Sequence, residues 1–300
     1  MKPIIGIDLG GTKIEGVILE SRQNPNVLAR KRIPTESNRG YQPVMNNIAA
    51  LVKDLEDSTQ LKFENIGIGT PGAKEPKTGL MKNCNTTCLN GNPLEEDLSK
   101  LLHKEVKIAN DANCFAMAEY HLGVVKQSYP EAKVAFGVIM GTGVGGGLVI
   151  DGKTIHGLHG IGGEWGHIRL VENGNECYCG KKGCVETYIS GTFLESFYQK
   201  ETGIKRRLNE IFDKSNLEKD EVAMKTKERL LDYYGLAMSY LINIVDPDII
   251  VIGGGVGNVD FLYDEGREYI LKYIFNKELN TPIVKPSLGD SAGVFGAAFL

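Results

Sequence analysis

The sequence predicts an α/β protein with two domains, and three observations support this. A chain of 300 residues is longer than most single hydrophobic cores, so two domains are the natural expectation. Strand-like and helix-like apolar patterns alternate along the chain. A buried strand that runs into a glycine-rich turn occurs twice, at Ile4–Lys13 and Val134–Gly147, and each copy opens one half of the chain. We therefore expect two related α/β halves around a cleft.

The first half predicts a strand meander followed by alternating helices and strands. Apolar residues at helical spacing, such as Val44, Ile48 and Leu51, define its first helix. Its expected elements are the strands Pro3–Asp8, Ile14–Leu19 and Val27–Ile33, the helix Gln42–Leu55, the strand Asn65–Gly69, the loop Ala73–Pro93, the helix Leu94–Leu102 and the strand Val106–Ala109.

The second half predicts a glycine-rich hairpin, a long helix and a small-residue helix at its end. The stretch Gly160–Glu186 has no regular pattern. The expected elements are the helix Ala112–Leu122, the strand Val134–Met140 with its hairpin partner Leu148–Ile150, the helices Gly191–Lys200 and Val222–Val245, the strand Asp248–Ile252, the helix Phe261–Phe275, the strand Ile283–Lys285 and the helix Ala292–Leu300.

Composition narrows the functional classes. The 34 basic and 38 acidic residues give a formal net charge of −4, which does not favour nucleic acid or an anionic membrane surface as a partner. No apolar run of about 18 residues predicts a membrane-spanning helix. The N-terminus enters a strand pattern at once, unlike a signal peptide. Six cysteines without a secretory signal favour a reducing cytoplasmic location and a metal or thiol role over disulfides.

Two stretches match the glycine fingerprint G-x-G-x-x-G, but neither has the context of a dinucleotide-binding fold. That fingerprint must follow a strand and open a helix. The match Gly67–Gly72 contains Pro71 and runs into a loop, and the match Gly141–Gly146 runs into the strand-like Leu148–Ile150. We therefore reject a dinucleotide fold, and the absence of G-x-x-x-x-G-K-[ST] excludes a P-loop enzyme.

The alternative is a pair of β-hairpins whose glycine turns bind phosphate through backbone N–H groups. The predicted nucleotide-binding residues are Asp8, Gly10, Gly11, Thr12, Lys13, Gly141, Thr142 and Gly143, together with Gly254 and Gly255, where a flat adenosine could lie against backbone. Asp8 would hold Mg²⁺, because this ion prefers few carboxylates plus phosphate oxygens. The plainer alternative is two ordinary tight hairpins and a strand end.

Asp111 follows the apolar run Val106–Ala109 and is flanked by Asn110 and the carboxamide of Asn113. A carboxylate at a strand end is placed like a reacting group, and we expect it to act as a general base. The alternative is that Asp111 only caps the helix that starts at Ala112, since Asp is a preferred N-cap.

His167, Cys177, Cys179 and Cys184 have the spacing H-x9-C-x-C-x4-C. One imidazole and three thiolates are enough for a closed tetrahedral Zn²⁺ site with a structural role. The alternative is a reduced loop with chance cysteines. Cys84, Cys88 and Cys114 lack such spacing and are expected to be packing residues. A zinc-pinned loop would hold flanking carboxylates rigidly, and the side chains suited to sugar hydroxyls are Asn85, Asn110, Glu164 and Glu186.

Taken together, these motifs resemble the ROK family of bacterial sugar kinases, and the resemblance spans essentially the whole chain. It rests on Ile5–Lys13, Asn110–Asn113, Gly141–Gly143, Gly162–His167, Cys177–Glu186 and the final Gly289–Gly293. It implies a two-domain fold of the actin/hexokinase (ribonuclease H-like) type, with ATP and sugar in the interdomain cleft. The implied domains are 1–110 with the C-terminal helix 288–300, and 111–287 with the zinc loop and a dimer surface.

The resemblance also implies roles and partners. Asp111 is the base, Glu164, His167 and Glu186 approach the sugar, and the second ring nitrogen of His167 is available to a hydroxyl. ATP, Mg²⁺ and structural Zn²⁺ are the implied cofactors, and a homodimer is a family-level expectation. Repressors of the family carry a DNA-binding segment before the first turn, and no room for one exists before Asp8, so no nucleic-acid partner is expected.

Within the family, the segment 82–91 most resembles fructokinases (mannokinases), so phosphorylation of D-fructose to fructose 6-phosphate is the first expectation. The segment 163–170 is also close to N-acetylglucosamine kinases, which leaves N-acetylglucosamine, mannose or glucose as alternatives. Two other classes compete: a non-catalytic sugar-sensing regulator and a chaperone-like or cytoskeletal ATPase. The intact Asp111 argues against the first, and the zinc-ordered carboxylates argue against the second.

Overall fold

The computed structural model describes residues 2–289 and 292–300, and the chain forms two compact units. The first unit contains residues 1–130, 147–162 and 287–300, and the second contains residues 131–146 and 163–286. Asp290 and Ser291, part of the C-terminal motif, lie outside the described residues. Of the helices that the structure describes, none has both the length and the apolar character needed to cross a bilayer.

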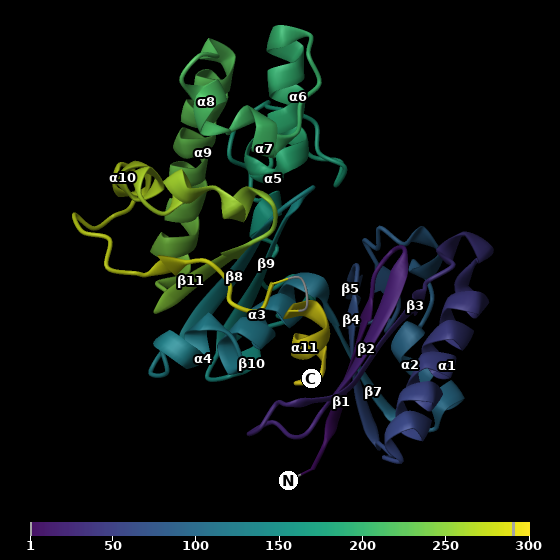
Figure 1. The fold of residues 1–300 in the computed structure, drawn as a ribbon. Helices are drawn as coiled ribbons and strands as arrows, with labels where there is room; N and C mark the ends of the chain where they lie inside the picture. Colours follow the sequence, from purple (N-terminus) through teal and green to yellow (C-terminus); the bar gives the residue numbers. More distant parts are fainter. Residues whose placement is uncertain (1, 290–291) are drawn as a thin grey trace. The chain divides into compact units, whose positions relative to one another are not determined.

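The first unit is built on a five-stranded mixed sheet in the order β3-β2-β1-β4-β7 (Figure 1). The first three strands form the expected antiparallel meander, and β4 and β7 join it in parallel. The bounds are β1 Ile4–Leu9, β2 Lys13–Leu19, β3 Val27–Pro34, β4 Asn65–Thr70 and β7 Glu105–Asn110. The first turn, which we define as Gly10–Thr12, joins β1 to β2.

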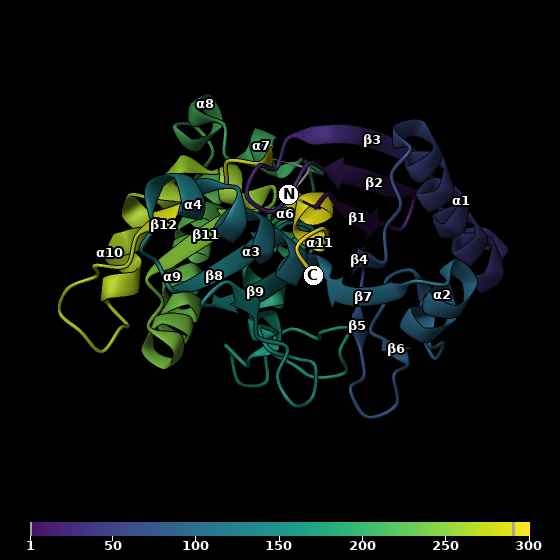
Figure 2. The same cartoon turned by 90° about the horizontal axis from the view of Figure 1, so that it is seen from below.

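Alternate residues of β1 face opposite sides of this sheet. Ile5 and Ile7 belong to the main core beneath helix α1, whereas Gly6 faces helix α11 (Figure 2). A Cβ on Gly6 or on Gly67 would collide with the backbone of α11, so only glycine allows this close packing. The helices of the unit are α1 Tyr41–Thr59, α2 Leu94–Leu102, α3 Asp111–His121, α4 Val124–Ser128 and α11 Ala292–Ala297.

The C-terminal segment returns to the first unit through Glu119, a buried residue of α3. The carboxylate of Glu119 accepts hydrogen bonds from the N–H groups of Ser287 (3.1 Å) and Leu288 (3.0 Å). Helix α11 then packs against α3 and β1. This unit includes α3 and α4, although the sequence predicts both in the second domain. The reason is that α11 packs on α3. The domain limits themselves stay a prediction.

The second sheet has the strand order β10-β9-β8-β11-β12, with β8, β11 and β12 parallel. Its bounds are β8 Val134–Met140, β9 Val144–Ile150, β10 Lys153–Thr154, β11 Ile249–Gly253 and β12 Ile283–Val284. The helices of the second unit are α5 Glu186–Ile189, α6 Gly191–Thr202, α7 Leu208–Ile211, α8 Lys214–Leu217, α9 Glu221–Val245 and α10 Glu265–Leu271. Within this unit α6 and α8 pack against α9, and α7 packs against α6 and α8 (Figure 1).

Three sequence expectations are corrected. The glycine turn of the second half is shorter than expected, because Gly145–Gly147 belong to strand β9, where Gly146 packs directly against the Trp165 ring. The expected helix Phe261–Phe275 is only α10, preceded by a 3₁₀ turn at Asp260–Leu262. Its apolar end is not on a buried face, since Phe275 is 94% exposed. The expected loop Ala73–Pro93 contains the short strands β5 Ala73–Lys74 and β6 Met81–Lys82 and a 3₁₀ turn at Thr87–Leu89.

Candidate active site

Hydroxyl groups from the segment after β3 hold the first turn in shape. The Thr35 hydroxyl donates to the carbonyl of Gly10 (2.7 Å), and the Ser37 hydroxyl donates to the carbonyl of Gly11 (3.0 Å). The Gly10 N–H also donates to the carbonyl of Lys13 (3.0 Å). The predicted phosphate-binding residues of the first half therefore share one braced turn. Thr35 and Ser37 carry no local sequence signal for this role, because only the folded meander brings them to the first turn.

Two carboxylates lie at the edge of the first sheet beside this turn. Because β1, β4 and β7 run parallel, Asp8 near the end of β1 and Asp111 just after β7 come to the same edge. Burial, then the nearby charges of Asp111 and Glu15, raise the pKa of Asp8 to about 6. Partial desolvation by the surrounding protein raises the pKa of Asp111, although its side chain keeps contact with solvent.

The helix after β7 is capped by Asn110 and not by Asp111. The Asn110 side-chain oxygen accepts a hydrogen bond from the N–H of Asn113 (2.9 Å), and α3 begins at Asp111. The alternative that Asp111 is the N-cap of this helix is therefore wrong, because Asn110 is the residue that accepts the free N–H at the helix start. The Oδ1 atom of Asp111 accepts a hydrogen bond from the adjacent N–H of Ala112 (2.8 Å).

Three residues that the sequence analysis treated as packing, or did not assign, border this site. Burial and the two carboxylates raise the pKa of the Cys114 thiol well above its usual range, so Cys114 lies beside them as a neutral group. A Cβ on Gly293 of α11 would lie 3.4 Å from the Asp8 carboxylate. The buried Thr86 hydroxyl lies next to Gly11, and no other described residue hydrogen-bonds to it.

The second turn, which we define as Gly141–Gly143, lies in the second unit and is held by a carboxylate. The Glu186 side chain accepts the N–H of Val144 (2.9 Å), and a Cβ on Gly143 would lie 2.5 Å from the same carboxylate oxygen. The N–H of Gly191, the first residue of α6, donates to the carbonyl of Gly141 (2.8 Å). The positive end of the α6 dipole therefore adjoins the second turn.

The second predicted glycine segment of this half, Gly254–Gly255, also reaches the second turn. Gly254 has a φ of +83°, and a Cβ there would collide with the carbonyl of Met140. A cavity of about 530 Å³ opens beside these segments and is lined by Gly141, Thr142 and Gly255 among others. That volume is within the range of small-molecule sites. The predicted nucleotide residues of the second half are thus brought together.

The His/Cys cluster is assembled as the spacing predicted. The ligand atoms of His167, Cys177, Cys179 and Cys184 all lie within 4.8 Å of one another. The Cys179 and Cys184 sulfurs are 3.7 Å apart, and His167 Nδ1 is 3.5 Å from the Cys177 sulfur. Ligands about 2.0–2.3 Å from a tetrahedral zinc ion are separated by about 3.3–3.8 Å, so the donor set and its spacing fit zinc.

The sugar-type residues fall into two groups. Glu164 and Glu186 of the second unit both lie near Tyr178, whose pKa is raised to about 12 by partial desolvation and then by the charges of Glu186 and Glu164. The His167 nitrogen turned away from the sulfurs, Nε2, is 3.1 Å from the Tyr178 hydroxyl. Tyr178 was not predicted, although its place between two cysteine ligands is a usable signal.

Asn85 and Asn110 belong to the other group, in the first unit with Asp111. Asn85 is exposed, and its N–H donates to the carbonyl of Pro71 (3.4 Å).

Comparisons with known proteins agree on one family. The sequence pattern of the ROK family matches residues 4–300. An N-acetyl-D-glucosamine kinase of Vibrio atlanticus is 37% identical over 306 residues, which cover 98% of each chain. The N-acetyl-D-glucosamine kinase of Vibrio cholerae is 35% identical over 307 residues, again covering 98% of each chain.

Solved structures agree as well. The ROK hexokinase from Thermus thermophilus is 29% identical with a TM-score of 0.85, over 99% of this chain and 97% of that one. The ROK family glucokinase from Streptomyces griseus, solved with glucose and AMPPNP, is 26% identical with a TM-score of 0.77, over 99% of this chain and 98% of that one.

The chain therefore belongs to the ROK family. Its fold is the expected α/β fold of the actin/hexokinase type, because the matched structures cover nearly the whole chain. It is a sugar kinase of this family, as the resemblance implied.

Proposed function

We propose that the protein transfers the γ-phosphoryl group of ATP to N-acetylglucosamine. The observation that carries the reaction class is the pair of carboxylates, Asp8 and Asp111, beside the braced first turn. The N-acetyl sugar is favoured by the curated relatives, which are N-acetyl-D-glucosamine kinases 34–37% identical over almost their full length. Fructose, the first expectation, has no comparable support and becomes the alternative substrate.

In this proposal Asp111 is the general base. Its raised pKa brings it closer to neutral pH than an ordinary aspartate, which suits proton transfer at physiological pH. It accepts the proton of the attacking sugar hydroxyl while that oxygen bonds to the γ-phosphorus and the bond to ADP breaks. Lys13 and the backbone N–H groups of the first turn stabilise the negative charge of the transferred group.

Asp8 is the proposed residue for magnesium. The site fits a dication, because burial and then the negative charges of Asp111 and Glu15 raise the pKa of Asp8, and a bound cation would offset that negative charge. Magnesium, when bound, neutralises phosphate charge. The second turn and Gly254–Gly255 are the proposed phosphate and adenosine contacts, supported by their convergence on the 530 Å³ cavity.

We propose that the His/Cys cluster holds a structural zinc ion. Four protein ligands leave no open position on a tetrahedral ion, which argues against a catalytic role. The cluster is joined to the second turn through Glu186, whose carboxylate also lies 4.0 Å from the Cys177 sulfur. Zinc would therefore stabilise the second turn as well as its own loop.

The proposed sugar contacts are Asn85, Asn110, Glu164, His167 and Glu186. Glu164 is only half-buried, which leaves it accessible to a ligand. Glu186 is 8% exposed and already binds the second turn, so we expect it to act mainly by holding that turn. A cytoplasmic homodimer also remains a proposal, and sedimentation equilibrium tests the dimer.

The test is ADP formation from ATP and Mg²⁺ with a panel of sugars. The panel contains N-acetylglucosamine, fructose, mannose, glucose and N-acetylmannosamine, with a sugar-free control. We expect turnover to depend on sugar and to be fastest with N-acetylglucosamine. A preference for fructose would keep the mechanism and change the substrate. No sugar-dependent turnover by a folded, zinc-loaded protein would contradict the kinase proposal and favour the sugar-sensing regulator.

A further inference from the structure

The cavity beside the second turn is bordered on its outer side by polar residues that the proposed function does not use. Its inner part is formed by the second turn and Gly255, but it is also lined by Glu195 of α6 and by Arg207 and Asn209 at the start of α7. Arg207 and Asn209 are exposed. The cavity therefore has a glycine-rich end suited to phosphate and a polar end with a guanidinium and a carboxamide.

Glu195 fixes this polar end. One of its carboxylate oxygens accepts the N–H of Leu208 (3.0 Å), and the other lies 3.5 Å from the Arg207 guanidinium. The Glu195 side chain is 25% exposed and that of Arg207 is 75% exposed. The guanidinium is thus tethered at one edge by a carboxylate while most of its surface stays open.

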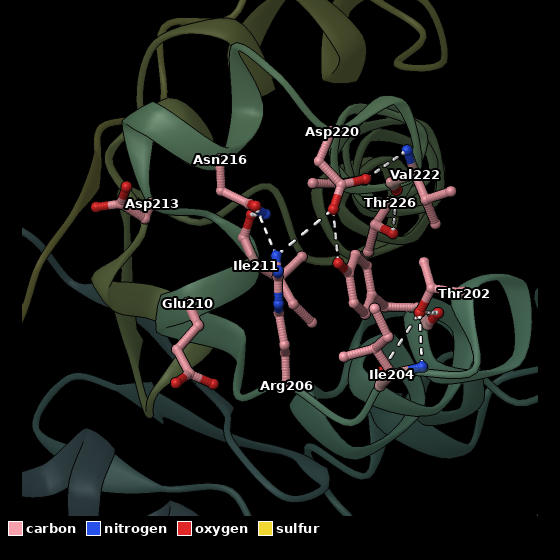
Figure 3. Close-up of polar contacts among 12 residues, drawn as sticks. Thr202, Ile204, Arg206, Glu210, Ile211, Asp213, Asn216, Asp220, Val222 and Thr226 are labelled. Atoms are coloured by element: carbon pink, nitrogen blue, oxygen red, sulfur yellow. Dashed lines mark hydrogen bonds and ion pairs between the residues drawn. The ribbon is translucent and has the colours of Figure 1, made fainter.

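A polar network around Arg206 holds the segment that carries Arg207 and Asn209 in place (Figure 3). Arg206 donates to the side chain of Asn216 (2.6 Å) and lies 3.5 Å from the carboxylate of Asp220. Asp220 also accepts the hydroxyl of the buried Tyr198 (2.6 Å) and caps the N-terminus of α9. Arg206 is therefore structural, and the residues that follow it are presented on a fixed segment, as a recognition site requires.

We propose that Arg207 and Asn209 bind the nucleobase of the phosphoryl donor and make the enzyme select ATP. This inference rests on the proposed kinase function. On the N7 edge of the base, the Asn209 carboxamide can accept from the N6 amino group of adenine and donate to N7, whereas guanine presents two acceptors, O6 and N7, on the same edge. The flat, partly tethered guanidinium stacks on the base. The phosphates then extend toward the second turn and the N-terminus of α6.

The experiment compares the wild type with Asn209→Ala, Asn209→Asp, Arg207→Ala and Arg207→Lys. Lys205→Ala is the matched control, since Lys205 is an exposed neighbour that does not line the cavity. Initial rates are measured at saturating N-acetylglucosamine with ATP, GTP or inorganic tripolyphosphate as donor. Binding of ADP is measured separately by calorimetry, which does not require turnover.

We expect Asn209→Ala to raise the KM for ATP and the Kd for ADP by about 10-fold, the worth of one or two hydrogen bonds, with kcat changed less than about twofold. The ratio of the rate with ATP to the rate with GTP should be smaller in this variant than in the wild type. Asn209→Asp should behave similarly because it loses the amide donor. Arg207→Lys should resemble Arg207→Ala, since an ammonium cannot stack as a guanidinium does. Lys205→Ala should match the wild type.

Unchanged ADP affinity in folded Asn209 and Arg207 variants would overturn the inference. So would a wild type that uses tripolyphosphate as well as ATP. These results differ from failure of the proposed function. A wild type that binds ADP in an Asn209-dependent way but turns over none of the sugars would sink the kinase proposal and keep the nucleotide site.

Discussion

The first and second turns resemble each other in sequence but are stabilised by different chemistry. Each joins a buried strand to its hairpin partner through glycine and threonine. The carbonyls of the first turn accept the hydroxyls of Thr35 and Ser37. The second turn packs against the carboxylate of Glu186 and is hydrogen-bonded to Gly191 at the start of α6.

The surroundings of the two turns differ even more. The first lies beside two carboxylates, Asp8 and Asp111, and burial together with the nearby negative charges raises the pKa of Asp8. The second is packed so closely that a single Cβ on Gly143 has no room. We infer that the first turn takes part in the charge changes of the reaction, whereas the second turn mainly holds the bound ligand in position. Four predictions test this distinction, from the largest expected effect to the smallest.

Asp111→Asn should lower kcat by about 10²–10⁴-fold, the usual contribution of a general base. The amide has nearly the same size as the carboxylate but cannot take up a proton. The measurement is ADP formation with the preferred sugar. Asn46→Asp, at an exposed position of α1, is the control for effects of substitution and purification alone, and it should keep the wild-type rate. Near-normal turnover by Asp111→Asn would contradict the assignment of charge chemistry to the first unit.

Cys184→Ser should remove the zinc ion and lower the melting temperature by about 5–10 °C, because a structural metal contributes folding free energy. Elemental analysis should find about one zinc per wild-type chain and none in the variant. Cys88→Ser is the matched control, because this half-buried cysteine is outside the cluster and should leave the zinc content unchanged. Wild-type protein without zinc, purified free of chelators, would refute the metal site.

Asp8→Asn should stabilise the protein above pH 6 while impairing turnover. The pKa of Asp8 is about 6 in the folded protein against 3.8 for the ordinary group, so its ionisation opposes folding above pH 6. The gain should be at most about 3 kcal/mol at pH 8, and it should shrink as the pH falls from 6 towards 4, because Asp8 is then protonated in the folded protein while the unfolded chain is still partly ionised.

Urea unfolding without nucleotide or magnesium measures this difference. A destabilised Asp8→Asn variant at pH 8 would mean that favourable contacts of the carboxylate outweigh the cost of its burial and of the nearby negative charges.

Gly143→Ala should destabilise the protein by about 1–3 kcal/mol, since the new methyl group displaces the Glu186 carboxylate from the N–H of Val144. Gly11→Ala should change stability by less than about 0.5 kcal/mol, because its Cβ would meet the Thr86 hydroxyl at 3.6 Å, an ordinary contact. Thermal melting of both variants makes the comparison. Equal losses would erase the distinction between the turns.

Much of the candidate site could be predicted from local sequence, because its signals are local. Asp111 follows an apolar strand directly, the four zinc-type ligands lie within 18 residues, and both glycine turns follow buried runs. The failures also have physical reasons. Gly145–Gly147 were assigned to a turn, but they are strand residues that allow close packing against Trp165 and α3. Whether a glycine serves a bend or a close approach depends on a neighbour from elsewhere in the chain.

The sequence by itself determined the α/β class, the family, the His/Cys cluster and the places of the two turns, since each depends on residues near one another along the chain. Only the tertiary structure decided what holds these parts. The meander brings Thr35 and Ser37 to the first turn, Glu186 joins the His/Cys cluster to the second, and the segment after α6 places Arg207 and Asn209 at the cavity. Such contacts join residues about 25 to 65 positions apart, and local spacing carries no information about pairs that only folding brings together.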